Sequence, residues 1–449
     1  MGRLSTAYCR SHVGLKFVLA LASTMIIATI LLSPPEQNSY EKRDKYIVDV
    51  LPHEPPIVTI VDTQPEITSL TKLREECDNL ASLWDSHNID SIDDKSCERI
   101  QESCGVPDCH EAIIDGVITW VDGSDPVFRA GYLNTLEYAA ALDPRHKPGT
   151  KKLREGGVRD FGQLRYALRS IAANAPWIRR IFLITDNQWP DCLLPANETL
   201  KLRHVTHDQL FDFYYQARHP DRIDAQRLPS YNSIALELMT PFIPKLGRMY
   251  LAFSDDMSFL NPTPLSFVYN KESGRGVLHM WERFDNPLLE GRAAVSKRWA
   301  TEYFGGSVID CPLRRRHGCA IPAHGPVLVV KEVFIDAWNK IGDTMDTTVY
   351  HPMRTEDRDP DTWPFLMLIG HAKFYEIKED KFALFFAMMT KATILKLLNS
   401  MENDHQSKMG CLNDNFDDDH GPVSPALINL MTKTYENRFP VKAPWELAV

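Results

Sequence analysis

The sequence predicts an α/β protein built on a mostly parallel sheet. Three observations lead to this fold class: short apolar runs recur, helical segments separate them, and acidic residues directly follow three of the runs. Alternating strands and helices are typical of a parallel sheet whose strand ends meet at one edge. Ligands of such sheets bind beyond the carboxyl ends of the strands. We therefore expect the functional site at the strand-end acids.

Length and composition indicate a globular protein with no feature of a nucleic-acid binder. The chain has 449 residues and a formal net charge of −10, enough for one large domain or two ordinary ones. No basic run points to nucleic acid, and the one short basic segment, residues 314–317, is typical of a solvated loop. We therefore expect no nucleic-acid partner.

An apolar segment near the N-terminus predicts a membrane anchor. Residues 17–33 carry no charge and approach the length of a bilayer-spanning helix. Basic side chains precede this segment at Arg3, Arg10 and Lys16. By the positive-inside rule, residues 1–16 form a cytoplasmic tail and the rest of the chain is translocated. A cleaved signal peptide is the alternative, but the long run and the lack of a small-x-small cleavage site favour an uncleaved signal-anchor.

Two features fit a lumenal catalytic part, in the Golgi or elsewhere in the secretory pathway. Asn197-Glu-Thr199 is an N-glycosylation sequon in a polar loop. Of the nine cysteines, eight lie beyond the anchor: Cys77, Cys97, Cys104, Cys109, Cys192, Cys311, Cys319 and Cys411. An even number in an oxidising compartment favours disulfides, whose pairing stays open. No Cys-x-x-Cys pair is present, which argues against a zinc site.

Residues 34–112 are predicted to be a stem and a cysteine-containing cap. The first part, to about residue 69, is rich in Pro, Glu, Asp and Lys and should have little packed structure. Residues 70–110 look partly helical and stapled by cysteines. We expect this cap to carry no chemistry of its own.

The first core strand is predicted at residues 116–121. Asp122-Gly-Ser-Asp125 follows it directly. Gly123 permits a tight turn and a close approach of the backbone to a ligand. The segment is either an ordinary Asp-Gly turn or a strand-end loop that binds a nucleotide sugar.

The next helix and strand are predicted at residues 160–174 and 181–185. Asp160 can cap the helix. Arg165 and Arg169 lie four residues apart and share a helix face. These arginines are either solvated or bind a diphosphate or sugar phosphate. Asp186 follows the strand as the second strand-end acid.

An adjacent pair of acids follows the strand predicted at residues 249–253. Asn232 or Ser233 could cap the helix before that strand, close to the strand ends. Asp255 and Asp256 stand just past the strand. Paired carboxylates at this position suit Mg²⁺ or Mn²⁺, which would in turn hold substrate phosphates. The alternative is a solvated turn.

The second half of the chain offers fewer signals. His324 lies in a loop made rigid by Pro and Gly, and a lone histidine of this kind is either structural or catalytic. Arg354 has a planar fork suited to a phosphate oxygen. Residues 283–298 are predicted to be an irregular polar segment, and 327–341 a strand followed by a helix. A closing helix is expected at residues 428–439.

These motifs, taken in order, resemble the Stealth proteins from residue 113 to residue 443. Residues 114–126 (IDGVITWVDGSDP) resemble their first region, and residues 160–190 with LPSYNS at 228–233 and SDD at 254–256 resemble their second. Residues 318–326 (GCAIPAHGP) with 354–357 (RTED) resemble the third, and 411–415 (CLNDN) the fourth. The chain departs from the family pattern at Asp122, Asp186-Asn187 and Ser254, which border the expected donor site and bear on the donor sugar.

The resemblance implies a sugar-phosphate transferase. The family includes the animal enzyme that places GlcNAc-1-phosphate on mannose of lysosomal glycoproteins, and bacterial capsule polymerases. It implies a glycosyltransferase-like α/β core and transfer of a hexose-1-phosphate from a nucleotide-diphosphate sugar to a hydroxyl of a glycan or polysaccharide. Two alternatives stay open: an ordinary metal-dependent glycosyltransferase, and a non-catalytic sugar-binding relative.

The residues and the resemblance together predict a set of roles. His324 is the expected general base, Arg354 stabilises the phosphoryl oxygens, and Asp256 acts with Asp255 in holding Mg²⁺ or Mn²⁺. Substrate contacts are expected at the following positions: Asp122, Gly123, Asp125, Arg165, Arg169, Asn232, Ser233, Asp414 and Asn415. Asn197 is the expected glycosylation site.

Overall fold

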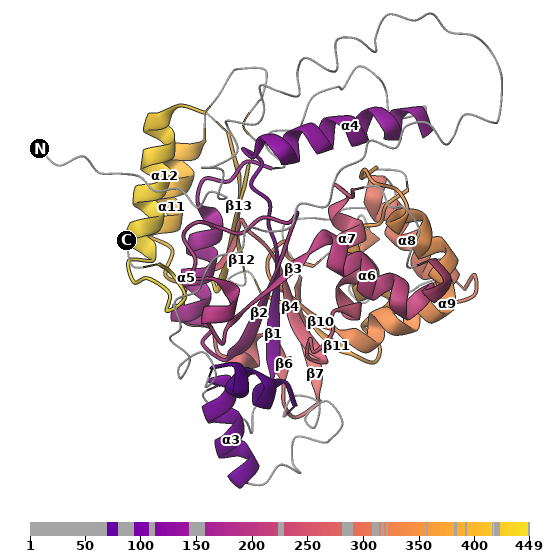
Figure 1. Ribbon diagram of the computed structural model, residues 1–449, viewed down its shortest axis with the longest axis horizontal. Coiled ribbons are helices and arrows are strands. Elements are labelled where there is room, and N and C mark those ends of the chain that lie inside the picture. Colours follow the sequence, from indigo (N-terminus) through magenta and orange to yellow (C-terminus); the bar gives the residue numbers. More distant parts are fainter. Residues whose placement is uncertain are drawn as a thin grey trace, which may run out of the picture.

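The structure is a computed structural model (Figure 1). It describes residues 70–79, 94–106, 113–142, 158–222, 229–280, 291–307, 314–315, 318–319, 322–355, 358–380, 384–390, 393–414, 416 and 423–447. The predicted tail, the anchor at 17–33 and the stem up to residue 69 lie outside the described residues. Among the described residues, no helix is both long enough and apolar enough to span a membrane.

A five-stranded sheet forms the centre of the molecule. Its strand order is β10-β4-β1-β2-β3, and the strands are β1 (Ile114–Thr119), β2 (Ile178–Thr185), β3 (Leu202–Thr206), β4 (Met249–Ser254) and β10 (Val327–Val330). The pairs β1–β2, β1–β4 and β2–β3 are parallel, and only β10 runs antiparallel, beside β4. The predicted α/β class with a mostly parallel sheet is confirmed.

In the central sheet, β4 and β10 are apolar almost throughout, β2 is buried along its whole length, and only β3 is largely polar and partly exposed. Continuous apolar runs of this kind are typical of parallel strands covered by helices on both sides. The sheet and its flanking helices share one large hydrophobic core. In Figure 1, α5 (Gln163–Asn174), α11 (Ile394–Glu402) and α12 (Pro425–Arg438) lie on one side of the sheet.

The opposite side of the sheet carries a second group of helices. These are α6 (His207–Arg218), α7 (Ser233–Met239), α8 (Gly291–Tyr303) and α9 (Lys331–Val349), and α10 (Thr362–Gly370) packs against α8 and α9. The prediction of an irregular segment at 283–298 is wrong for its second half, because α8 begins at Gly291. That helix mixes basic and apolar residues around its circumference, so its sequence shows no clear helical period.

Smaller sheets flank the central one. One has the order β11-β7-β6, with β6 (Tyr269–Asn270), β7 (Arg275–Met280) and β11 (Tyr375–Glu379). Another has the order β12-β13-β5, with β5 (Met257–Phe259), β12 (Leu384–Met389) and β13 (Met409–Asp414). A two-stranded ribbon joins β8 (Arg314–Arg315) to β9 (Gly318–Cys319). The β12-β13-β5 sheet matters for the site because β5 directly follows the acid pair.

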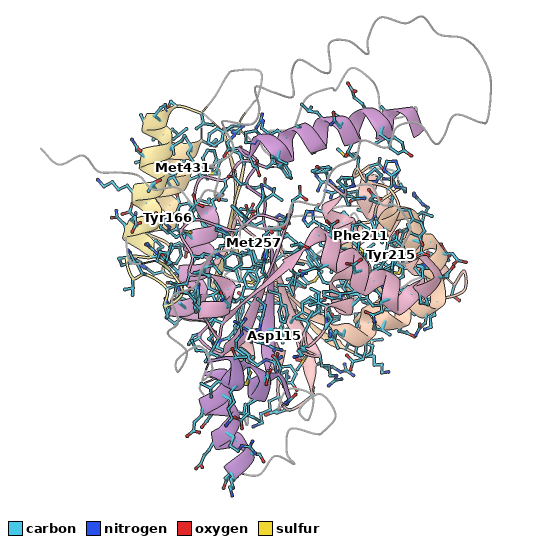
Figure 2. The ribbon with its side chains drawn as sticks, in the orientation of Figure 1. Asp115, Tyr166, Phe211, Tyr215, Met257 and Met431 are labelled. Atoms are coloured by element: carbon cyan, nitrogen blue, oxygen red, sulfur yellow. A yellow bond between two sulfur atoms is a disulfide. The ribbon has the colours of Figure 1, made fainter. Side chains whose placement is uncertain are left out.

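The N-terminal cap covers the edge of the sheet where β1 begins. It consists of a helix at residues 70–79 and α3 (Asp94–Cys104), joined by the disulfide Cys77–Cys104. Asp78 of the cap forms an ion pair with the buried Arg180 of β2. Asp115, labelled in Figure 2 at this lower end of the sheet, is fully buried and accepts two hydrogen bonds from Arg179. The contact of Asp78 with Arg180 joins the described part of the cap to the central sheet.

Four of the described cysteines are disulfide-bonded, as the sequence favoured, and one is not. Besides Cys77 and Cys104, both Cys97 and Cys192 are disulfide-bonded. Cys411, however, is free and buried. The even number of cysteines therefore does not mean that every one of them is paired.

Candidate active site

The three strand-end acids lie at one edge of the central sheet, as predicted. Thr119 of β1 pairs with Ser254 of β4 and with Ile184 of β2, so these parallel strands end level with one another. Asp122, Asp186 and the pair Asp255-Asp256 follow these ends. In Figure 1, α4 (Pro126–Leu142) lies across this edge, at the end of the sheet opposite the cap.

Asp255 and Asp256 form the turn between β4 and β5. Both are partly exposed, and Met257, which follows them, lies near the middle of the molecule in Figure 2. The Asp256 Oδ2 atom accepts a hydrogen bond from the Cys411 thiol at 3.3 Å. The Asp256 Oδ1 atom is buried and has no hydrogen-bond partner among the described residues. A buried carboxylate oxygen without a partner is costly, and a cation or a substrate donor would satisfy it.

The electrostatics of the pair also favour a cation. Burial raises the pKa of Asp255 well above its ordinary value, and the charges of Asp256 and Asp160 raise it further. Burial likewise raises the pKa of Asp256 to about 6, with an added contribution from Asp414 and an opposing one from the Cys411 hydrogen bond. Both shifts arise because negative charge is concentrated where hydration is restricted. A bound divalent cation would reverse them.

Asp160 contributes a third carboxylate that sequence reasoning used only as a helix cap. Its Oδ1 atom accepts from the backbone N–H groups of Gly162 (2.6 Å) and Gln163 (2.8 Å) at the start of α5, while Gly162 itself occupies the N-cap position. Its Oδ2 atom accepts from the Trp120 indole at 2.9 Å. Burial raises the pKa of Asp160 to about 6 despite these hydrogen bonds, and the charge of Asp122 adds to the effect. The helix therefore begins inside the acidic site.

Asp414, at the end of β13, lies close enough to act on the charge of Asp256, as its predicted place at the site requires. Its ion-pair partner is Arg159, which the sequence analysis did not identify. Arg159 Nη1 lies 3.1 Å from Asp414 Oδ2. Asp414 also accepts a backbone hydrogen bond from Phe416 at 2.9 Å. Because Arg159 precedes Asp160 in the chain, an arginine just before a helix-capping aspartate is the signal that could have identified it. Asn415 lies outside the described residues.

The loop after β1 is fixed by its own hydrogen bonds. Asp122 is buried, and its Oδ1 atom accepts from the backbone (2.8 Å) and hydroxyl (2.6 Å) of Ser124. Asp125 caps α4 by accepting from the Val127 N–H at 2.8 Å. The Gln188 side chain crosses from the β2 loop and donates to Asp122 O and Asp125 Oδ2, both at 3.1 Å. The loops after β1 and β2 therefore form one connected surface.

Gly123 lies against another part of the chain. A Cβ atom on this residue would lie 2.2 Å from the Val158 carbonyl oxygen and 2.7 Å from the Val158 side chain. Contact of Gly123 with substrate stays a prediction, whereas the glycine itself is explained by Val158, with which a side chain at position 123 would collide. The sequence could not show this contact because the two residues lie in separate segments of the chain.

Asp186 faces histidine at the β2 end of the site. The Asp186 Oδ1 atom lies 3.6 Å from His207 Nδ1. Burial raises the pKa of Asp186 to about 6, with contributions from Asp208 and Asp125. Burial also lowers the pKa of His207 to about 4, so this imidazole is neutral near pH 7 and does not form a salt bridge.

His324 leaves the sheet at the same edge as the acid pair. Val327 of β10 pairs antiparallel with Ala252 of β4, so the chain before Val327 and the chain after Ala252 emerge together. Hydrogen bonds within the 322–325 loop hold it, including Gly325 N–H to Ala323 O at 2.9 Å. Burial lowers the pKa of His324, and the nearby charge of Arg292 lowers it further. The imidazole is therefore neutral at pH 7 and can accept a proton.

Arg354 and Ser233, two of the predicted site residues, contact one another. Arg354 is exposed, and its Nη1 atom donates to Ser233 Oγ at 3.3 Å. Beneath them, Glu237 of α7 accepts from Thr362 Oγ1 at 2.5 Å.

The charges of this region connect it with His324. Burial raises the pKa of Glu237 to about 7, and the positive charges of Arg292 and Arg354 oppose that rise. Arg292 also acts on His324, so its charge influences both Glu237 and His324.

Two predicted substrate ligands are structural. Arg169 is buried and forms a bidentate ion pair with Glu446, at 2.7 and 3.0 Å, and a third contact with Glu436 at 2.8 Å. Asn232 is fully buried, caps α7 through Ile234 N–H at 3.2 Å, and donates to Asp359 at 3.2 Å. We expected substrate contacts from both, and their polar atoms instead bind protein groups.

The remaining two predicted residues lie in the described chain as follows. Arg165 lies 3.9 Å from Glu446 and thus faces the same C-terminal segment as Arg169. Asn197 is exposed in the short helix Ala196–Glu198, where a glycan could be attached. Its glycosylation stays a prediction.

The described part of the chain holds no group of three or more His, Cys, Asp or Glu side chains arranged to bind a metal. Mg²⁺ sites in enzymes that bind phosphates commonly use one or two carboxylates, with substrate phosphates and water as the other ligands. Asp255 and Asp256, with the unsatisfied Oδ1 atom, fit such a site. The metal stays a proposal.

Comparison with known proteins identifies two conserved regions. Residues 157–276 match Stealth protein CR2, conserved region 2, and residues 402–449 match Stealth protein CR4, conserved region 4. The first region contains Asp160, Asp255 and Asp256, and the second contains Cys411 and Asp414. Residues from both regions therefore meet at the acid pair.

Curated relatives carry consistent names. The exopolysaccharide phosphotransferase CpsY of Mycobacterium tuberculosis (strain H37Rv) is 28% identical over 342 residues, covering 74% of this chain and 58% of CpsY. The capsular polysaccharide phosphotransferase LcbA of Aeromonas hydrophila is 31% identical over 234 residues, covering 50% of this chain and 56% of LcbA. This chain thus spans somewhat over half the length of these relatives.

A solved structure of the galactosyltransferase LgtC, in complex with donor and acceptor sugar analogues, aligns over 71% of this chain and 96% of that one. The TM-score is 0.29 and the identity 12%. A similarity this low carries no argument about fold or activity, so the glycosyltransferase-like core stays a prediction.

Proposed function

Because the chain belongs to the Stealth family, as its two conserved regions show, we propose that it is a sugar-phosphate transferase. In this proposal it transfers a hexose-1-phosphate from a nucleotide-diphosphate sugar to a hydroxyl of an acceptor glycan, forming a phosphodiester. The names of the relatives support the reaction class. The observation that carries the proposal is the acid pair at the carboxyl end of β4, with its unsatisfied Asp256 Oδ1 atom.

Asp255 and Asp256 would hold Mg²⁺ or Mn²⁺ against the donor diphosphate. When bound, such a cation neutralises the diphosphate and the charge that develops on the leaving nucleotide. Asp160 and Asp414 would strengthen the attraction for the cation, because their charges act on the pair. Arg159 would hold Asp414 in place through their ion pair.

We assign the acceptor side of the reaction to His324, Arg354 and Ser233. The acceptor hydroxyl oxygen forms a bond to the phosphorus that carries the sugar, and the bond from that phosphorus to the nucleoside monophosphate breaks. His324 takes the hydroxyl proton, for which its lowered pKa keeps it in the neutral, accepting form. Arg354, held by Ser233, would stabilise the phosphoryl oxygens.

We further propose that this reaction takes place in the lumen of the secretory pathway. The disulfide Cys77–Cys104 fits an oxidising compartment, and the sequon at Asn197 is exposed. The apolar segment at 17–33 with the basic residues before it would place the N-terminus in the cytoplasm and anchor the chain as a type II membrane protein.

The test is to incubate the full chain with a panel of nucleotide sugars and Mn²⁺ or Mg²⁺, and to measure the nucleotide released. We expect nucleoside monophosphate from at least one donor when an acceptor glycan is present. The Asp256→Asn variant keeps the shape of the side chain and should lose at least about 100-fold in turnover. Release of nucleoside diphosphate would indicate ordinary glycosyl transfer, and no release from any donor would favour a non-catalytic relative.

A further inference from the structure

Cys411 is a buried thiol in contact with the acid pair. It is about 1% exposed and is a free cysteine, in a chain whose other described cysteines outside the two-stranded β8–β9 ribbon are disulfide-bonded. Its Sγ atom donates to Asp256 Oδ2 at 3.3 Å, within the range for a hydrogen bond to sulfur. No role of this residue follows from the proposed function itself.

The backbone fixes the two residues relative to one another. Cys411 of β13 pairs antiparallel with Met257 of β5, the residue that follows Asp256. Leu412 N–H donates to Asp256 O at 3.3 Å, which extends the pairing to the residue just before β5. The thiol and the carboxylate therefore meet because two strands are paired, and a side chain at position 411 cannot easily move away from Asp256.

The two oxygen atoms of Asp256 have different environments. Oδ2 accepts the thiol proton, whereas Oδ1 is buried with no hydrogen-bond partner among the described residues. A carboxylate is planar, so fixing one oxygen fixes the direction of the other. The thiol hydrogen bond thus holds the oxygen that lacks a partner in one orientation.

A thiol is a suitable hydrogen-bond donor for orienting the Asp256 carboxylate. A thiol is neutral and a weak hydrogen-bond donor, so it orients Asp256 without neutralising its charge. Asp414, in contrast, lies 3.1 Å from the guanidinium of Arg159, which balances its charge. A cationic partner at position 411 would compete with a metal ion for the carboxylate, and a hydrophobic one would leave both oxygens unoriented.

We propose that Cys411 is a positioning residue for the metal-binding carboxylate, whose thiol proton holds Asp256 with Oδ1 directed at a divalent cation. The inference rests on the proposed function, because it needs the cation. The competing explanation is that Cys411 is a small apolar residue that fills the core between β13 and β5. That role would affect stability and not metal affinity.

The experiment compares Cys411→Val, Cys411→Ala and Cys411→Ser in the full chain. Valine keeps the volume without a donor, alanine removes both, and serine keeps a donor. Direct Mn²⁺ binding is measured by electron paramagnetic resonance of the free ion, which requires no substrate or turnover. Loss of groups that orient metal ligands typically weakens metal affinity by roughly 10- to 100-fold, and for this weak donor we expect about 10-fold in the valine and alanine variants.

The serine variant should bind Mn²⁺ within about threefold of wild type, because a hydroxyl can also donate to Oδ2. In turnover assays, valine and alanine should raise the Mn²⁺ concentration needed for half-maximal rate, and saturating Mn²⁺ should restore most of kcat. Thermal unfolding without metal identifies which variants remain folded, and a folded valine or alanine variant is sufficient for the comparison.

Wild-type Mn²⁺ affinity in a folded valine or alanine variant would overturn the role of Cys411 while leaving the proposed function intact. The same holds if serine loses as much affinity as valine, since a donor would then be irrelevant. Failure of the wild-type chain to bind Mn²⁺ would overturn the metal site of the proposed function and this inference with it.

Discussion

His324 and the acid pair have opposite pKa shifts that suit opposite tasks. Burial raises the pKa of Asp255 and Asp256 above ordinary values, which makes a cation the natural partner of the pair. Burial lowers the pKa of His324, and the Arg292 charge adds to this. Groups whose environments shift their pKa values in this way are typical of sites for acid–base and metal chemistry. These shifts support the proposed roles, in which the neutral imidazole would act as the base and the carboxylates as metal ligands.

The base role of His324 predicts a pH profile. A histidine accepts protons only above its pKa, and this pKa lies below the ordinary 6.5. With saturating metal, kcat/KM should therefore stay high as the pH falls to about 6.5 and decline only below it. The His324→Gln variant should lose roughly 10²- to 10⁴-fold in kcat/KM at pH 7.

The control is His405→Gln, because His405 is exposed and lies in the loop after α11, away from the acids. It should have wild-type activity. A His324→Gln enzyme that keeps its activity, or an acidic limb centred well above 6.5, would show that another group accepts the proton.

At the scale of elements, α5 serves both the site and the architecture. Its start is capped by Asp160 within the acidic site, and its middle is joined to the C-terminal segment by Arg169 and Glu446. Tyr166 stacks on Tyr435 of α12, with ring centroids 4.9 Å apart, and Figure 2 places Tyr166 and Met431 on this side of the molecule. The helix thereby links the two conserved regions of the family.

The buried ion pair predicts a large effect of Arg169 on stability and a small one on catalysis. The Arg169→Ala variant leaves Glu446, which is about 3% exposed, without its partner. Breaking such a pair costs about 3–5 kcal/mol. We expect that loss in the free energy of unfolding from denaturant titration, with donor KM unchanged wherever the variant remains folded.

Arg165→Ala is the matched control for this prediction. Arg165 lies one turn earlier on the same helix, and its Nε atom is 3.9 Å from Glu446, so its loss should cost under about 1 kcal/mol. A folded Arg169→Ala enzyme with a strongly raised donor KM would restore the phosphate-binding role that the sequence suggested.

Local patterns predicted the elements well because each strand carries its own signal. The runs before Asp122, Asp186 and Asp255 are apolar over four or more residues, and parallel pairing then aligns their ends. The β10–β4 pairing brings the chain just after His324 to the sheet end where the acid pair lies, and the catalytic role of His324 stays a prediction. The strands themselves are revealed by short-range sequence patterns, whereas their order in the sheet comes from the structure.

Contacts between distant segments were beyond such patterns. Arg169 and Glu446 are 277 positions apart, and Cys411 and Asp256 are 155 apart. Nothing near Arg169 distinguishes a buried ion-pair partner from a phosphate ligand. Likewise, the sequence around Gly123 indicates only a turn, and the close contact with the Val158 backbone is visible only in the structure. Pairwise packing across the fold decides these roles.

At the scale of the whole molecule, the cap and the site lie at opposite ends of the central sheet (Figure 1). The cap covers one edge of the sheet through Asp78 and Arg180, and the acids occupy the other edge. The exposed Asn197 lies in the connection between β2 and β3. The exposed sequon and the disulfide Cys77–Cys104 are both compatible with the proposed lumenal location.

The compartment proposal predicts a glycan on Asn197. The full chain expressed in animal cells should show a mass shift that an endoglycosidase removes, and Asn197→Gln should abolish that shift. Asn134→Gln is a suitable control, because Asn134 is exposed on α4 and lies in no sequon. An unmodified Asn197 together with reduced cysteines would contradict a lumenal location.

The most direct test of the central claim is the linkage of the reaction product. After incubation with donor, acceptor glycan and Mn²⁺, the product is examined by ³¹P nuclear magnetic resonance and mass spectrometry. Attack at phosphorus predicts a phosphodiester between the two sugars and one nucleoside monophosphate per turnover. A product without phosphorus, joined by a glycosidic bond and accompanied by nucleoside diphosphate, would contradict the account.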